Sequence, residues 1–207
     1  MKRISACAVI SILALSGCVE TLASIAAPNV DTGVSALRVG DYRLDPDHAA
    51  LLFEVDHLKL SKFIGRFTGV EASLSFDPDE LQSARVDAHV DMTTLAISES
   101  DFAKTLMGTD WFDAAKFPDA AFHSTAVRQT GDATGEIDGV LTLHGISHAE
   151  TLKVTFNGGG RDLIRGAYVV GFSATATIKR SDFGVDRFEG LVGDDVLIRF
   201  EGEFIRK

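Results

Sequence analysis

Apolar and polar residues alternate along most of the chain after residue 40, which is the pattern of β-strands with one buried and one solvated face. The alternation marks the segments 50–58, 70–76, 86–92, 137–143, 151–156, 168–178 and 196–204. About eight strands of this kind, with no crossover helices between them, favour a closed barrel over a parallel sheet. We therefore predict an all-β fold, an antiparallel eight-stranded barrel.

The stretch from Trp111 to Ser124 is where a helical pattern ends and an extended one begins. Phe102 and Leu106 lie four residues apart in 98–107, which predicts a short amphipathic helix. Pro118 prevents that helix from continuing, and the residues from Phe122 onward have a strand pattern. Because four aromatic rings fall within this stretch, we expect Phe122 in the barrel wall and Leu106, Trp111 and Phe112 in whatever covers the barrel mouth.

The segment Asn157-Gly158-Gly159-Gly160 is expected to be a turn between two strands. A phosphate-binding loop is excluded here because neither a Lys-Ser/Thr pair nor the start of a helix follows the glycines.

A barrel of about eight strands is either filled by side chains or holds one small ligand. The strand phases place small residues beside large rings on the inner face, and this mixture is compatible with an open channel and with a filled core alike. If the barrel is open, the residues predicted to line the cavity are Phe53, Val55, Leu74, Val90, Phe122, Leu141, Val154, Phe172 and Phe200.

The first residues resemble an export signal, with Lys2 and Arg3 before the apolar run 6–15. The signal ends in Leu15-Ser16-Gly17-Cys18, which resembles the lipobox of bacterial lipoproteins; a plain export signal is the alternative. We expect residues 1–17 to be a signal peptide, residues 18–39 a tether with an acylated Cys18, and residues 40–207 the barrel domain. This predicts a periplasmic protein anchored to a membrane, by resemblance the outer rather than the inner one.

The net charge of the chain limits the kinds of molecule that it can bind. Removal of residues 1–17 leaves 18 of the 20 basic residues against 30 acidic ones, a formal charge of −12. Such a chain repels nucleic acid, so no nucleic-acid partner is expected. A homodimer is left open by the sequence.

The six histidines and the many carboxylates are the candidates for catalytic or metal-binding motifs. His144 and His148 straddle Gly145 without a helix to align them, so they do not form a zincin motif. The mature domain lacks a cysteine nucleophile and a G-x-S-x-G elbow, and its carboxylates were assigned to turns and outward strand faces. We expect no catalytic residues, no metal, no cofactor and no enzymatic activity; His57 alone is in phase with the inner face and is a candidate contact for a polar ligand group.

The segment 178–185 combines two bases, a hydroxyl, an acid and a ring. Phe183 is expected to plug the barrel at its mouth after a tight turn at Ser181-Asp182. Arg180 is the alternative functional residue, a contact for the polar end of a ligand.

Six motifs in order resemble those of the YceI family of lipocalin-like, polyisoprenoid-binding periplasmic proteins. They are Tyr42-x-Leu44-Asp45-Pro46-x-His48, Phe53-x-Val55-x-His57, Gly65-x-Phe67 with Gly69, Trp111-Phe112-Asp113-Ala114-x-x-Phe117-Pro118 with Phe122-x-Ser124-Thr125, Gly139-x-Leu141-Thr142-Leu143-x-Gly145, and Arg180-Ser181-Asp182-Phe183-Gly184. The resemblance implies a lipocalin-like barrel with one or two short helices near its mouth. It also implies non-catalytic binding, storage or transfer of a long-chain isoprenoid or similar fatty amphiphile, of quinone or polyprenyl type.

Two rival functions remain at this point. An enzyme acting on a hydrophobic small molecule would require a titratable group deep in the barrel. A stress-related structural or interaction module would have a filled barrel and would bind partners through its acidic outside.

Overall fold

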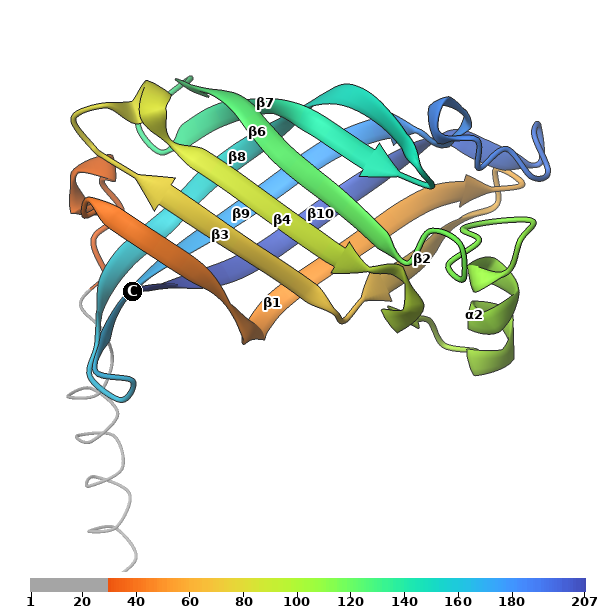
Figure 1. Cartoon of the computed structure of the whole chain (residues 1–207), viewed down its shortest axis with the longest axis horizontal. Helices are drawn as coiled ribbons and strands as arrows, with labels where there is room; N and C mark the ends of the chain where they lie inside the picture. Colours follow the sequence, from red (N-terminus) through yellow and green to blue (C-terminus); the bar gives the residue numbers. More distant parts are fainter. Residues whose placement is uncertain (1–29) are drawn as a thin grey trace, which may run out of the picture.

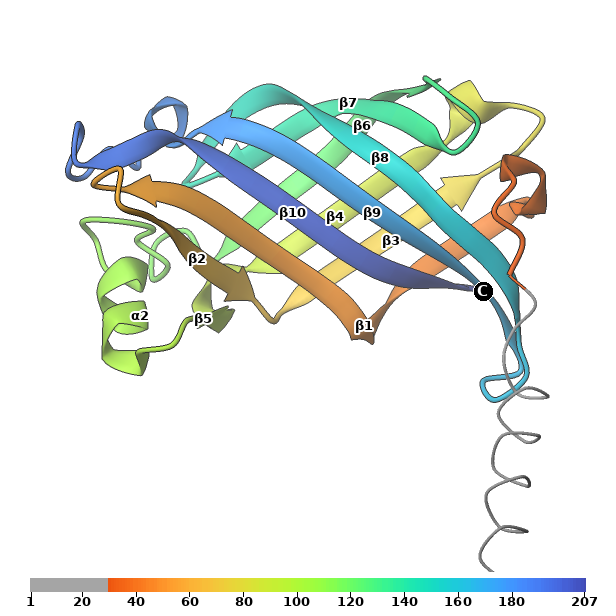
Figure 2. The ribbon, with the colours of Figure 1, turned by 180° about the vertical axis from the view of Figure 1, so that it is seen from behind.

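A computed structural model describes residues 30–207 of the chain, and ten strands dominate it (Figures 1 and 2). The strands are β1 (Gly40–His57), β2 (Ser61–Phe67), β3 (Val70–Phe76), β4 (Arg85–Asp91), β5 (Leu95–Ala96), β6 (Asp119–Gln129), β7 (Thr134–Leu143), β8 (Ile146–Asp162), β9 (Ala167–Lys179) and β10 (Val192–Arg206). One α-helix, α2 (Ser100–Met107), and four 3-10 turns, η1 (Val34–Ala36), η2 (Leu81–Ser83), η3 (Met92–Thr94) and η4 (Arg180–Phe183), complete the described part of the chain.

The strands form one antiparallel sheet in the order β10-β9-β8-β7-β6-β4-β3-β1-β2-β5, and pairing of β10 with β1 closes it. The first half of β1 pairs with β3 and its second half with β2, while β10 pairs with both halves. Eight strands therefore form the closed barrel, and β2 and β5 extend the sheet at one end. The predicted all-β, eight-stranded antiparallel barrel is confirmed.

Strand β1 is interrupted by a bulge between Leu44 and Ala49, where the register against β10 shifts. Asp45 is buried in this bulge and accepts hydrogen bonds from the Asp47 backbone N–H, at 3.2 Å, and from the His48 ring, at 2.9 Å. Burial alone would raise the pKa of Asp45, but these hydrogen bonds and the charge of Arg165 lower it. The bulge is thus held by an ionised carboxylate.

The predicted turn at 157–160 is wrong, because these residues lie inside β8. Gly158, Gly159 and Gly160 pair with Gly171, Val170 and Val169 of β9, with a register shift after Phe156. The glycines are required by a close approach rather than by a turn: a Cβ on Gly158, whose φ is 132°, would nearly overlap the side chain of Val30.

The end of the predicted tether belongs to the folded unit. Asp31 exchanges two backbone hydrogen bonds with Gly159, at 3.0 and 2.9 Å, and Leu37 is buried in the core. The Tyr168 hydroxyl donates to the backbone carbonyl of Ala36. Residues 31–37, which the prediction placed in the tether, therefore pack against the barrel. The predicted signal peptide, Cys18 and the start of the tether lie outside the described residues.

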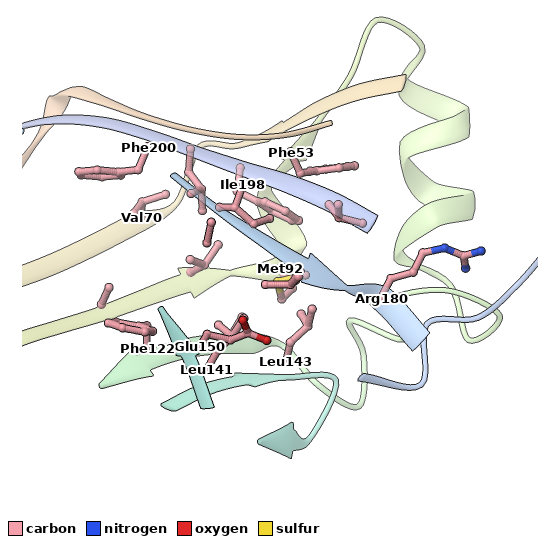
Figure 3. Close-up of a pocket in the computed structure, with 18 of the residues that line it drawn as sticks. Phe53, Val70, Met92, Phe122, Leu141, Leu143, Glu150, Arg180, Ile198 and Phe200 are labelled. Carbon is pink, nitrogen blue, oxygen red and sulfur yellow. The ribbon is translucent and has the colours of Figure 1, made fainter. Parts of the chain in front are cut away.

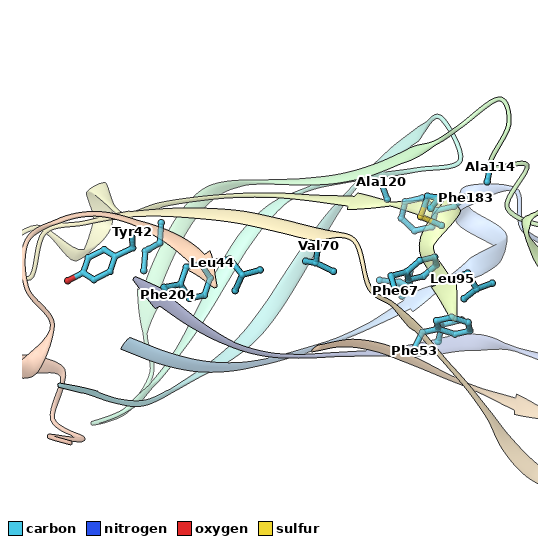
Figure 4. Close-up of a cluster of buried hydrophobic side chains, with 14 of the residues drawn as sticks. Tyr42, Leu44, Phe53, Phe67, Val70, Leu95, Ala114, Ala120, Phe183 and Phe204 are labelled. Atoms are coloured by element: carbon cyan, nitrogen blue, oxygen red, sulfur yellow. The ribbon is translucent and has the colours of Figure 1, made fainter. Parts of the chain in front are cut away.

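The two ends of the barrel differ. At the end that carries η1, the core is closed by the buried Tyr42 and Phe204 (Figure 4), and by the buried Val170, which pairs with Phe204. The Tyr42 hydroxyl donates to the Arg38 carbonyl at 2.6 Å. Burial raises the pKa of Tyr42, so this hydroxyl stays a donor. The opposite end carries α2 and β5 (Figure 2). Within residues 30–207 no helix has the length and apolar character needed to span a membrane.

Candidate ligand-binding cavity

A cavity of about 740 Å³ runs inside the barrel from the α2 end toward the closed end. Its lining is almost entirely apolar, which follows from the period-two alternation: the lining positions of β1, β4, β6 and β9 carry aliphatic, alanine or aromatic side chains, apart from His57 at the rim and Thr175 on β9. A volume of this size lies within the range typical of small-molecule sites.

All nine residues predicted to line a cavity lie on its wall: Phe53, Val55, Leu74, Val90, Phe122, Leu141, Val154, Phe172 and Phe200. Phe53 and Phe200 lie on the opposite side of the cavity from Phe122 and Leu141 (Figure 3). The strand phases taken from the sequence therefore hold around the whole barrel. That these side chains contact a ligand stays a prediction.

The predicted mouth residues Leu106, Trp111 and Phe112 also line the cavity, at its α2 end. The Phe112 ring packs edge-on against Phe53 and Phe67, with centroids 6.1 and 5.9 Å apart, so it joins the mouth segment to the wall. His57 lies at the exposed rim of the same end.

The aromatic stretch divides around Pro118 as expected, with one ring outside the cavity. Phe117 packs against the ring of His144, with centroids 4.6 Å apart, and covers Gly145. The Pro118 carbonyl accepts a hydrogen bond from the Met92 N–H at 2.7 Å. These contacts fix the strand β6 that carries Phe122 into the wall.

Arg180 contributes only its stem to the cavity, and its guanidinium points away from it (Figure 3). The guanidinium donates to four backbone carbonyls, of Gly193, Val185, Arg187 and Val192, at 2.5–3.1 Å. These bonds tie η4 to the loop before β10. The structure thus favours a structural role for Arg180 over the predicted contact with a ligand head group.

Phe183 is fully buried but is absent from the cavity lining. Its ring packs against His148 with centroids 5.1 Å apart, and its carbonyl lies 3.1 Å from the His144 ring nitrogen Nδ1. Phe183 is therefore a buried core residue of η4 that packs outside the cavity lining; that it plugs the barrel mouth or contacts a ligand stays a prediction.

Glu150 is an acidic cavity residue that the sequence analysis did not identify. It belongs to β8, lies opposite Gly139 of β7, and projects beside Leu141 and Leu143 (Figure 3). Burial in this apolar surrounding raises the pKa of Glu150; His148 opposes the rise and Asp182 adds to it. The signal was present in the sequence, because Glu150 is in phase with Leu152, Val154 and the buried Phe156.

Exposed apolar side chains surround the mouth. Leu60, in the turn between β1 and β2, is 83% exposed, and Leu58, Phe102, Phe188 and Leu191 are exposed as well. Phe102 and Phe188 also line the cavity, so they connect its apolar wall to the exposed apolar side chains at the rim.

A second cluster brings together Asp45, His48 and Glu203, three residue types that can ligate metals. The Arg165 guanidinium already lies among them, 2.7 Å from Glu203 and 3.3 Å from Asp45. Its charge compensates both carboxylates, and the cluster holds the β1 bulge against β10. We assign it a structural role.

A closed antiparallel barrel with one apolar cavity, open at one end, defines a lipocalin-like small-molecule-binding fold. The chain belongs to the YceI family: the YceI-like domain matches residues 42–204, nearly the whole barrel.

Relatives of this family agree with that assignment. A UPF0312 protein of Pseudomonas fluorescens strain Pf-5 is 33% identical over 192 residues, which cover 88% of this chain and 96% of the relative. A UPF0312 protein of Pseudomonas syringae pv. syringae is 33% identical over 168 residues, which cover 80% and 87%.

Solved structures show the same fold. Burkholderia cenocepacia BcnA is 24% identical with a TM-score of 0.70, and the match covers 77% of this chain and 98% of that one. The Campylobacter jejuni YCEI protein is 26% identical with a TM-score of 0.64, covering 73% and 90%. A polyisoprenoid binding domain from Saccharophagus degradans, implicated in plant cell wall breakdown, is 12% identical with a TM-score of 0.60, covering 82% and 100%.

Proposed function

We propose that this protein binds a long-chain isoprenoid or a similar amphiphilic lipid, of quinone or polyprenyl type, without catalysing a reaction on it. The observation that carries the proposal is the continuous apolar cavity of about 740 Å³ that opens at one end of the barrel. The family assignment and a structural neighbour described as a polyisoprenoid binding domain support the same ligand class.

Burial of the tail is sufficient to hold such a ligand. Each buried CH₂ group contributes about 0.8 kcal/mol, and association costs about 4 to 15 kcal/mol, so a tail of roughly 20 buried carbons offsets even the upper cost. The single open end sets the direction of entry. The tail enters past Trp111 and Phe112 and lies against the rings of Phe53, Phe172 and Phe200.

The two rival functions find less support. An open cavity of this volume argues against a structural module with a filled barrel. An enzyme requires an acid or base held in working geometry, but His57 lies at the exposed rim while Glu150 lies on the β8 wall. Among the residues that the structure describes, Glu150 is influenced by burial and by the charges of His148 and Asp182, and no hydrogen bond orients it.

We further propose that the protein acts in the periplasm, held by acyl chains on Cys18 to a membrane, the outer one by the residue that follows Cys18. The lipobox-like segment 15–18 supports this. Two or more acyl chains are needed for a stable anchor, because a single chain binds only marginally. Storage or transfer of the lipid between membranes is the role that such a location would give it.

Lipid extraction tests the ligand proposal directly. The full-length protein is purified from its native host without added lipid, and its extract is analysed by mass spectrometry. We expect a stoichiometric long-chain amphiphile that is absent when the same protein is denatured, delipidated and refolded. Repeated recovery of protein without any amphiphile would reject the proposal.

A further inference from the structure

Glu150 is the only acidic residue among the cavity-lining residues that the structure describes. It lies directly opposite Gly139, which has no side chain to cover it. The ring of Phe122 occupies the space above Gly139, because a Cβ there would lie against that ring. The Glu150 side chain thus lines the cavity among apolar groups, with Leu141 diagonally across on β7 (Figure 3).

The basic side chains that line the cavity either have hydrogen-bonding or ion-pair partners or lie at the exposed rim. Lys62 forms an ion pair with Asp56 at 2.9 Å on the exposed rim. The Arg180 guanidinium donates hydrogen bonds to four backbone carbonyls. His57 is at the rim. Among the described residues, no lining cation is thus placed to neutralise an anion beside Glu150.

The groups that act on Glu150 electrostatically are few. His148 lies two residues earlier on the same face of β8, and Asp182 lies in η4. Strand β7 places Gly139 opposite Glu150 and the apolar Ile137 and Leu141 diagonally across from it. The apolar surrounding holds the pKa of Glu150 above its usual range. A hydroxyl group is a suitable partner in both protonation states, because it donates to a carboxylate and accepts from a neutral carboxyl group.

We propose that Glu150 selects uncharged amphiphiles that carry a hydroxyl group and excludes amphiphiles whose head group is an anion, such as a phosphate or carboxylate. This inference rests on the proposed lipid-binding function. A bound tail displaces water from this apolar cavity, so a second negative charge near an ionised Glu150 is poorly screened and unpaired. A hydroxyl in the same place is hydrogen-bonded, and the tail contacts are unchanged.

Competition binding tests the inference with two probes that differ only in the head group. Geranylgeraniol and geranylgeranyl phosphate compete, below their micelle concentrations, for delipidated full-length protein loaded with the neutral fluorophore N-phenyl-1-naphthylamine. We expect the alcohol to bind at least about tenfold more tightly than the phosphate. Glu150→Gln removes the charge but keeps the shape, and should reduce the ratio severalfold. Glu71→Gln, on the exposed face of β3, makes the same change in net charge outside the barrel and should leave the ratio unchanged.

The outcomes separate the inference from the function beneath it. Equal affinities, tighter binding of the phosphate, or a ratio that survives Glu150→Gln would overturn the inference while leaving lipid binding intact. Failure of both probes to displace the fluorophore at any concentration would instead count against the proposed function.

Discussion

Phe53 and Gly65 are paired directly across β1 and β2, and the ring of Phe53 lies where a side chain at position 65 would be. A Cβ on Gly65 would lie 2.5 Å from two atoms of that ring. The same arrangement recurs where Phe122 covers Gly139 and Phe117 covers Gly145. Aromatic rings over glycines thus shape the mouth end of the barrel and set where its largest side chains point.

Gly65→Ala is expected to destabilise the protein by about 1 to 3 kcal/mol, because the added methyl group forces the Phe53 ring into the cavity or the strands apart. Urea denaturation followed by circular dichroism measures this. Gly171→Ala is the control, since the nearest atom to its added Cβ lies at 3.6 Å. Equal effects at the two positions would contradict the assigned role of the Phe53 ring.

Phe172→Asp should abolish most lipid loading, because it places a charge on the cavity wall that a buried tail would have to desolvate. Thr177→Asp introduces the same charge on the exposed face of β9 and should load normally. The amount of co-purified amphiphile per folded protein is the measurement. Comparable losses in both variants would show that the inward phase of β9 is misassigned.

Glu150→Gln should change how stability depends on pH. A raised pKa means that the fold favours the protonated carboxyl group, so the wild-type protein loses stability as the pH rises from about 4.3, the unfolded value, through the folded value. The glutamine variant lacks this loss. Its melting temperature relative to wild type should therefore increase between acid and neutral pH, and a constant difference across that range would contradict the assignment of Glu150 to an apolar surrounding.

Arg180→Lys is expected to cost about 3 kcal/mol, because a single ammonium cannot replace a buried guanidinium that donates to four backbone carbonyls. Chemical denaturation gives the stability, and competition binding below the unfolding range gives the affinity. We expect the stability to fall while geranylgeraniol affinity stays within about twofold. A large loss of affinity in folded protein would instead support a head-group contact.

Cys18→Ala tests the proposed anchor. The variant should leave the membrane fraction, because the acyl chains would be missing, while its barrel keeps the circular dichroism spectrum and lipid loading of the wild type. Fractionation of host cells followed by immunoblotting measures the distribution. Unchanged association of the variant with membranes would contradict acylation of Cys18 as the cause of anchoring.

The alternation of residue types was sufficient to predict the barrel and the inner face. A one-residue shift in register reverses every side chain, so the correct placement of Val55, Leu141 and Phe200 required the right phase on three separate strands. The alternation identifies the inward face reliably here because each of these strands has one face exposed to solvent. The short strands β2 and β5 carry no comparable pattern and were not separated from their neighbours.

The remaining errors come from long-range contacts that no local pattern contains. Asn157-Gly158-Gly159-Gly160 has turn composition, but Asp31 pairs with Gly159 there and keeps it extended. Arg180 was predicted to contact the polar end of a ligand, but its guanidinium donates hydrogen bonds to backbone carbonyls up to thirteen residues away. Glu150 was assigned to the surface because carboxylates usually are, although its phase relative to Leu152 pointed inward.

The closed end of the barrel is also the end at which the chain enters it, since Asp31 pairs with β8 there while α2 and the mouth lie at the far end (Figures 1 and 2). An anchor at Cys18 would accordingly hold the sealed base toward its own membrane. The opening, with its exposed Leu60 and Phe188, would then be directed across the aqueous space. Under the proposed anchoring, cargo would pass in trans, to an acceptor opposite the anchoring bilayer rather than back into it.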